Sequence, residues 1–371
     1  MADAFTFGLK EEYFLVDAQT KAATRAMPEG FLQAAKAATA GRAASEFLQS
    51  QIEVMTRPHA DVAAARSELR DLRRSLAKVA AEHGLAILAA GTHPSASWPY
   101  SRQSEGERYD SVMDDLQMIG HRNMLCGLHV HVEVPDAGRR IEIMSRLLPY
   151  LPLFIALATS SPFWRSRPTG LKGYRLAAYD ELPRTGIPEL FRTQADYDAY
   201  VAALVKAGVM PDASYIWWAI RPSLHHPTLE LRAPDCCTLL DDSIAIASLY
   251  RALVRHLFHN PRINGGIDAV QRAIVIENKW RAQRYGVHGS FVGDGGAVPV
   301  IDLLARVIDQ VTPDADALGC LAEIRRCRAI VDAGTSADAQ LRVFAQHQER
   351  CESHEEALRA VTDWIAVATL Q

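Results

Sequence analysis

The sequence predicts an α+β fold in which a mainly antiparallel sheet presents a concave polar face and helices pack on its other side. Several short segments alternate polar and apolar residues, as half-buried strands do. These segments do not alternate regularly with helical segments, which disfavours a doubly wound parallel sheet. The polar sides of several of them carry acids, histidines and arginines. We expect one domain spanning residues 1–371, with a mostly helical C-terminal segment from about residue 338.

The segment 127–134 carries the strongest pattern. Its period of two places His129, His131 and Glu133 on one face of a strand, while the opposite face is aliphatic. A solvated sheet surface is the plain alternative, but such surfaces favour Thr, Lys and Ser over paired histidines. The pattern therefore favours a metal-binding or catalytic face.

Four further segments repeat this arrangement. Residues 7–16 read as a strand in which Lys10 and Glu12 share a face, while Glu11 points to the opposite one. The other polar faces comprise Gln51 and Glu53 in 50–54, Trp217 and Arg221 in 215–221, and Thr228, Glu230 and Arg232 in 228–232. Together these strands predict one shared polar concavity, which no single strand would justify.

Helical periodicity indicates the covering elements. An amphipathic helix is expected over 59–83, and a second helix, capped by Asp241 or Asp242, is expected to run to about His259. The apolar stretch 147–158 contains two prolines and is too short to cross a bilayer, so it reads as a buried helix. Residues 166–190 are rich in Gly, Pro and Arg and read as a long functional loop.

Composition narrows the functional class. The 371 residues carry a net charge of −4 and no basic stripe, so we expect neither nucleic acid nor membrane partners. The six cysteines form no CxxC pair, and nothing near residue 1 resembles a signal peptide, which indicates the cytoplasm. Small-molecule substrates are the expected partners, and a homodimer is the base-rate expectation for assembly.

Familiar catalytic motifs are missing, and what remains is rich in oxygen donors. The sequence has no GxxxxGK loop, no GxGxxG fingerprint, no HExxH and no GxSxG elbow. Carboxylates are the ligands that Mg²⁺ and Mn²⁺ prefer, and one imidazole is compatible with them. The candidate ligand set comprises Glu12, Glu46, Glu53, Glu230, His129 and His131. Arg232, two residues from Glu230, could neutralise a transferring phosphoryl group.

Nine short motifs occur in an order that resembles the type 2 glutamate-cysteine ligase family, a group of ATP-dependent carboxylate-amine ligases. They are Gly8-Leu9-Lys10-Glu11-Glu12, Gln51-Ile52-Glu53, Gly91-Thr92-His93-Pro94, Gly127-Leu128-His129-Val130-His131, Ser160-Ser161-Pro162-Phe163-Trp164, Gly173-Tyr174-Arg175, Trp218-Ala219-Ile220-Arg221-Pro222, Thr228-Leu229-Glu230-Leu231-Arg232 and Asn278-Lys279-Trp280-Arg281. The resemblance implies a fold related to the catalytic domain of glutamine synthetase.

The resemblance also implies a reaction and a site. A carboxylate, typically the γ-carboxylate of glutamate, attacks ATP to give an acyl phosphate, which an amine then displaces. The implied cofactors are ATP and Mg²⁺ or Mn²⁺. The matching metal-ligand positions are Glu12, Glu53, His129 and Glu230, with Glu46 as a further acid. Arg221 and Arg232 match the catalytic arginines near the ATP phosphates, Arg175 matches the arginine on the substrate carboxylate, and His131 is expected to support its neighbours.

One position departs from the family pattern. The family usually has two acids at i and i+2 on the first strand, whereas the first of them is Lys10 here. Glu11 cannot replace it because strand geometry turns its side chain away. Our hypothesis is that this chain binds fewer metal ions and has altered ligase activity. Two rival functions stay open, namely a metal-dependent hydrolase using His129, His131 and Glu230, and a regulator that binds a nucleotide or amino acid without turnover.

Overall fold

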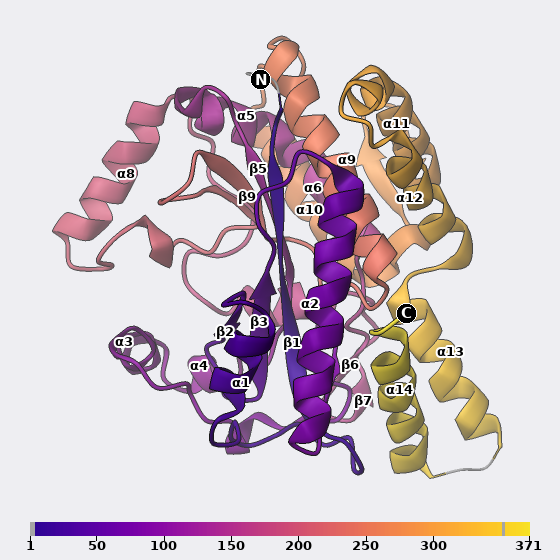
Figure 1. Ribbon diagram of the computed structural model, residues 1–371. Helices are drawn as coiled ribbons and strands as arrows, with labels where there is room; N and C mark the ends of the chain where they lie inside the picture. The colour runs from indigo at the N-terminus through magenta and orange to yellow at the C-terminus, as the bar shows by residue number, and fades with distance from the viewer. Residues whose placement is uncertain (1–3, 351–352) are drawn as a thin grey trace.

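The computed structural model describes residues 4–350 and 353–371, so Cys351 lies outside the described residues. Within them, one antiparallel sheet has the order β2-β3-β1-β5-β9-β8, with β4 added against β1 (Figure 1). Its strands are β1 (Phe7–Asp17), β2 (Ala43–Ser45), β3 (Gln51–Met55), β4 (Leu85–Leu88), β5 (Leu128–Glu133), β8 (Ile220–Pro222) and β9 (Thr228–Leu231). The long β1 lies near the centre because it pairs with three other strands.

Helices cover one face of the sheet. The helix α2 (Val62–Glu82) runs alongside β1 in Figure 1, and it also contacts α9 (Leu240–His259). The apolar side of α2 is buried, and Asp61 caps its first turn by accepting a hydrogen bond from the Ala64 amide. The aliphatic side chains of β5 are buried as well. This packing turns the polar side chains of the strands towards the other face.

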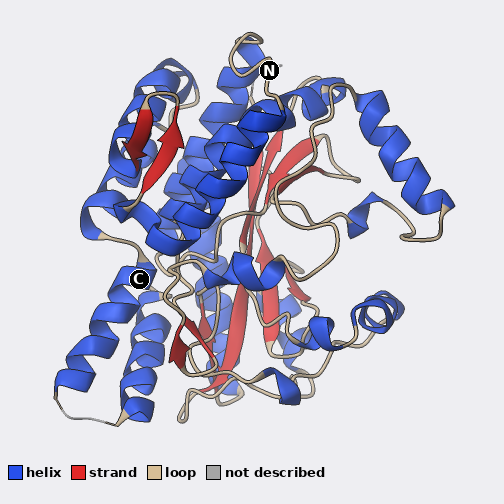
Figure 2. Cartoon of the chain, turned by 180° about the vertical axis from the view of Figure 1, so that it is seen from behind, coloured by secondary structure: helices blue, strands red, loops and turns tan. Residues whose placement is uncertain are grey.

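The remaining elements surround this core. The helices are α1 (Phe31–Ala38), α3 (Glu107–Leu116), α4 (Met118–His121), α5 (Arg140–Leu147), α6 (Leu151–Leu157), α7 (Tyr174–Tyr179), α8 (Gln194–Lys206), α10 (Ala269–Tyr285), α11 (Val300–Ala317), α12 (Leu321–Ala333), α13 (Ser336–Glu349) and α14 (His354–Ala368). Short 3-10 helices cover Trp98–Tyr100, Ala137–Arg139, Leu148–Tyr150, Ala213–Tyr215 and Gly286–His288. Two hairpins are made by β6 (Phe163–Trp164) with β7 (Arg167–Pro168) and by β10 (Ser290–Gly293) with β11 (Gly296–Pro299). Figures 1 and 2 place α3 and α8 on one side of the molecule and α11 to α14 on the other.

The observed elements confirm the predicted α+β class and correct several boundaries. The segment from about residue 338 is helical as expected, in α13 and α14, and two further helices, α11 and α12, precede it from Val300. Within the expected strand 215–221, only Ile220 and Arg221 lie in a strand, β8, because the Trp217 and Ala219 amides donate to the 184–186 loop instead. The loop 166–190 contains β7 and the short helix α7.

The start of α9 also differs from expectation. Its N-cap is Leu239, which provides no side-chain hydrogen bond, and Asp241 and Asp242 lie within the first turn. There they can interact with the positive end of the helix dipole without capping it. The described ranges contain no helix that combines the length and apolar character needed to cross a bilayer.

Candidate active site

Strand register brings the predicted side chains into one row across the sheet. Glu12 on β1 lies opposite Glu53 on β3, and Lys10 lies opposite His129 on β5. Continuing outward, His131 on β5 lies opposite Glu230 on β9, and Glu230 lies opposite Arg221 on β8. Residues from five separate motifs thereby reach one polar face.

An acidic cluster forms one half of this row. Glu12, Glu46 and Glu53 each offer a carboxylate oxygen within 4.8 Å of the others. The Lys10 ammonium lies among them, 3.4 Å from Glu12 Oε1 and 3.8 Å from Glu46 Oε2, and it forms a short ion pair with Glu53. Glu46 reaches the cluster from the segment immediately after β2.

Burial and mutual repulsion set the charges in this cluster. Burial raises the pKa of Glu46 to about 7, although the nearby Lys10 ammonium opposes the shift. The pKa of Glu12 is also raised, first by burial and then by Glu46. Burial alone would lower the pKa of Lys10, but attraction to Glu53, Glu46 and Glu12 raises it instead. Lys10 is therefore a permanent cation at neutral pH.

Glu230 and two arginines form the other half of the row. Arg221 Nε donates to Glu230 Oε2 at 2.6 Å, and Arg232 Nη1 donates to Glu230 Oε1 at 2.6 Å. Burial would raise the pKa of the Glu230 carboxyl, but Arg232 and Arg221 hold it well below its usual range. Charge-assisted pairs of this length fix the orientation of both guanidinium groups.

His129 lies between the two halves. Its Nε2 is 3.6 Å from Glu12 Oε1, and its Nδ1 is 3.6 Å from Glu230 Oε1. Burial, with the positive charges of Arg232 and Lys10, holds the pKa of His129 well below its usual range, so the imidazole is neutral. Its Nε2 is buried without a hydrogen-bond partner. A neutral imidazole with an unpartnered nitrogen beside a carboxylate fits a metal ligand.

The structure does not gather all the predicted metal ligands around one point. Within the described chain, the carboxylates that converge are Glu12, Glu46 and Glu53, whereas both oxygens of Glu230 accept from arginines. His131 is adjacent, because its Nδ1 is 3.0 Å from Thr228 Oγ1 and its Nε2 is 3.7 Å from Glu230 Oε1. Ligation by any of these residues stays a prediction.

Arg175 is buried and contacts the segment that follows β9. Its Nη1 lies 3.2 to 3.5 Å from the carbonyl oxygens of residues 232–234, to which it donates. A Cβ at Gly127 would lie 2.2 Å from Arg175 Nη2, so the glycine is required for this close approach. Arg175 thus supports the segment that carries Arg232, while its predicted contact with a substrate carboxylate stays a prediction.

Tyr179 is a site residue that sequence reasoning missed. Arg232 Nη2 donates to its hydroxyl at 3.3 Å, and the Arg175 guanidinium lies 5.6 Å from its ring centroid. Tyr179 follows Arg175 by four residues in α7, so both face the same side of that helix. That spacing is the available signal, although the composition of 166–190 predicts a loop.

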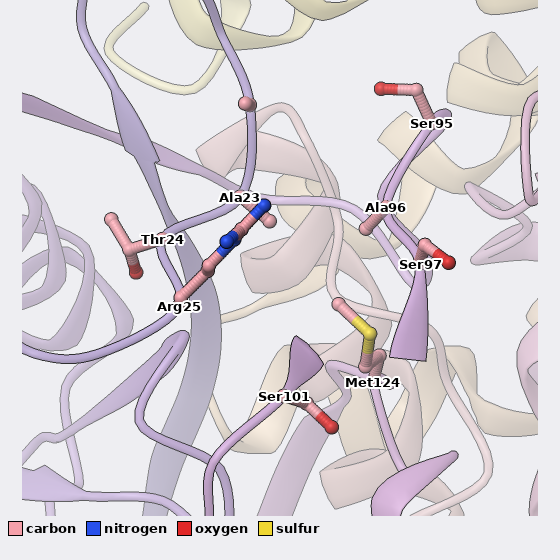
Figure 3. A pocket seen from close by; sticks show the side chains of 9 residues that line it. Ala23, Thr24, Arg25, Ser95, Ala96, Ser97, Ser101 and Met124 are labelled. Atoms are coloured by element: carbon pink, nitrogen blue, oxygen red, sulfur yellow. The ribbon is translucent and has the colours of Figure 1, made fainter. Parts of the chain in front are cut away.

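Of two cavities in the described chain, one adjoins this row and the other does not. One, of about 430 Å³, adjoins it and is lined by Lys10, His131 and Glu133 together with residues of the β3 end and the 226–228 turn. A smaller one, of about 170 Å³, lies beyond the other end of β1 and is shown in Figure 3. The residues lining the smaller cavity include no carboxylate, so only the larger one belongs with the charged row.

This chain is similar in sequence to a known protein family. The model described as Glutamate-cysteine ligase family 2 matches residues 6–363. A relative from Bradyrhizobium sp. (strain ORS 278), named "Putative glutamate--cysteine ligase 2", is 56% identical and covers 99% of this chain and 88% of its own. A relative of the same name from Rhodospirillum rubrum is 44% identical over 99% of this chain and 96% of its own.

Solved structures agree on the fold. A glutamate–cysteine ligase from Francisella tularensis, solved in complex with AMP, aligns with a TM-score of 0.70 at 13% identity, over 99% of this chain and 89% of that one. A bifunctional glutathione synthetase from Pasteurella multocida aligns with a TM-score of 0.68 at 13% identity, over 98% of this chain and 52% of that one. At these identities the likeness shows the shared fold alone.

Proposed function

Because this chain belongs to glutamate-cysteine ligase family 2, we propose that it is an ATP-dependent carboxylate–amine ligase. The nine sequence motifs predicted this family, and the match over residues 6–363 confirms it. In the proposed reaction, a carboxylate oxygen of the first substrate, taken as the glutamate γ-carboxylate, attacks the γ-phosphorus of ATP and ADP leaves. The amine then attacks the acyl carbon of the acyl phosphate, phosphate leaves, and the amine loses a proton.

One observation carries this proposal: Arg221 and Arg232 are held side by side on Glu230, next to a buried neutral His129. Phosphoryl transfer between two anions needs positive charge in fixed positions, because the reactants repel each other. Arginines locked by a carboxylate meet that need without reorganising during the reaction. An amide hydrolase transfers no phosphoryl group, so it would not need this guanidinium pair.

The chain's own groups divide the remaining work. Arg221 and Arg232 would contact the phosphates, and the cavity of about 430 Å³ beside His131 is within the size range of small-molecule sites. His129 and Glu12 would hold a divalent cation, Mg²⁺ or Mn²⁺, and the unpartnered His129 Nε2 is the observation that fits one. When bound, such an ion supplies positive charge to the phosphates.

We also infer a reducing cytoplasm as the setting for this reaction, with small molecules as partners. The described cysteines are free and buried. A homodimer stays our expectation for the assembly.

The test is a coupled product assay. Purified protein would be incubated with ATP, Mg²⁺, glutamate and a panel of amines that includes cysteine, while ADP and product mass are followed together. We expect ADP and amide in equal amounts, and a loss of at least a hundredfold in turnover for Arg232→Met. Arg74→Met, on the exposed side of α2, is the matched control and should keep full turnover.

Other outcomes would replace the proposal. Cleavage of an amide without ADP formation would identify a metal-dependent hydrolase. Binding of ATP in calorimetry, with no turnover for any amine, would identify a regulatory protein.

A further inference from the structure

The Lys10 ammonium lies where a cation between three carboxylates would lie. Strand alternation places Lys10 and Glu12 on the same face of β1, and Glu53 lies opposite Glu12 on β3. The ammonium is within 3.8 Å of an oxygen of each of Glu12, Glu46 and Glu53. Its side chain is 20% exposed, so it is largely enclosed by the groups that it pairs with.

A divalent ion and this ammonium cannot share the cluster. Mg²⁺ requires oxygens at about 2.0 to 2.1 Å in near-octahedral geometry, and Mn²⁺ also favours octahedral oxygen ligands. The three oxygens lie within 4.8 Å of one another, so an ion bound to all of them would lie between them. That space is next to the Lys10 nitrogen, which has the same sign of charge and no lone pair to donate. The cluster as built does not fit a divalent ion.

The neighbouring position differs. His129 Nε2 has no hydrogen-bond partner and lies 3.6 Å from Glu12 Oε1. The place beside His129 therefore keeps a nitrogen without a hydrogen-bond partner in the described chain, whereas the carboxylates around Lys10 already have a cation. Arg232 Nη1 lies 3.4 Å from His129 Nδ1, so ligation by Nε2 requires the ring proton to move to Nδ1, which is 3.6 Å from Glu230 Oε1.

We infer that Lys10 is a resident cation that replaces one divalent metal ion in the cluster of Glu12, Glu46 and Glu53, and leaves metal binding to the position beside His129. This inference rests on the proposed function only for the expectation that a metal-dependent ligase site is present. The Lys10 ammonium then supplies the positive charge in the cluster, and no exchangeable ion is needed there.

Metal counting tests this inference without any turnover. Metal-free protein would be titrated with Mn²⁺ in the presence of a non-hydrolysable ATP analogue, and free Mn²⁺ would be measured by electron paramagnetic resonance. We expect Lys10→Glu to bind one more Mn²⁺ per chain than the wild type. Lys78→Glu, which makes the same charge change on the exposed side of α2, should bind the same number as the wild type.

A second variant keeps the test valid if Lys10→Glu does not fold. Lys10→Met removes the ammonium without adding a ligand, and it should also bind one more Mn²⁺, with about tenfold or more weaker affinity than Lys10→Glu. Equal Mn²⁺ numbers in the wild type and both variants would overturn the inference.

Crystals of the wild type give an independent readout. In Mn²⁺-soaked crystals, the anomalous difference map should have no peak in contact with Glu46 and Glu53. A peak there would overturn the inference even if the protein proved to be an active ligase. Failure of the ligase assay alone would leave these metal counts unchanged, so the two proposals fail separately.

Discussion

Two neighbouring acids on β1 should respond to the same substitution in opposite ways. Glu11 is fully buried on the helix-covered face, where Arg73 Nε and Nη2 donate to its two oxygens at 2.8 and 2.7 Å. The Tyr13 and Ser243 hydroxyls also donate to it. Glu12, one residue later, faces the acidic cluster and accepts a hydrogen bond from the Gly127 amide at 2.7 Å.

The magnitudes follow from these partners. Glu11→Gln leaves the Arg73 guanidinium buried without a counter-charge, and breaking one side of a buried pair costs about 3 to 5 kcal/mol of unfolding free energy. Glu12→Gln keeps an acceptor for the Gly127 amide and removes a carboxyl whose raised pKa shows that the folded protein disfavours its charge. Its cost should stay below about 1 kcal/mol.

Urea denaturation followed by circular dichroism measures both free energies, with the exposed Glu82→Gln on α2 as the control. Mn²⁺ titration of the folded proteins supplies the second readout. Glu12→Gln should weaken Mn²⁺ binding about tenfold or more, whereas folded Glu11→Gln should bind it like the wild type. The reasoning is refuted if Glu11→Gln costs less than about 1 kcal/mol, or if the two variants lose equal stability.

Two further predictions concern the segments around the site. Gly127→Ala would place a Cβ 2.2 Å from Arg175 Nη2, so we expect it to lower the free energy of unfolding, measured by urea denaturation, by about 1 to 3 kcal/mol. Gly266→Ala is the control, because its Cβ would meet nothing within 4 Å, and it should cost no more than about 0.5 kcal/mol. Equal losses for the two variants would contradict the steric argument. Burial lowers the pKa of His93 to about 4, while its Nδ1 accepts from the amides of residues 95–96. The unfolded chain therefore takes up this proton first, and stability is lost as the pH falls from about 6.5 towards 4, by about 2 kcal/mol at pH 5. Thermal melts from pH 7.5 to 5 should show a shallower decline for His93→Gln, and identical slopes would exclude this histidine as the cause.

The polar face was predictable because strand alternation is a local property. The period of two placed Glu12 and Glu11 on opposite faces, and the structure confirms it through the cluster around Lys10 and the buried pair with Arg73. The same rule placed His129 and Glu230 on one face without any knowledge of the strand order.

Features set by distant contacts were not predictable. The segment 215–221 has the composition of a strand, but Trp217 pairs with the main chain of Arg184, which a sequence pattern does not reveal. The position of Arg175 depends on the absence of a side chain at Gly127, and only the folded structure brings these two together. Tyr179 was missed for the same reason, since its partner Arg232 is far along the chain.

Charge balance across the row explains why a lysine is compatible with this site. The charged side chains in contact there are Glu12, Glu46, Glu53, Glu230, Lys10, Arg221 and Arg232. With every carboxyl ionised, four negative charges face three positive ones, so the row is near neutrality before any ion binds. A glutamate in place of Lys10 would leave five negative charges against two, and their repulsion would lower the stability of the folded state until exchangeable cations offset it. On this charge balance, we expect the folded state of this face to depend less on bound cations with the lysine than with a glutamate at position 10.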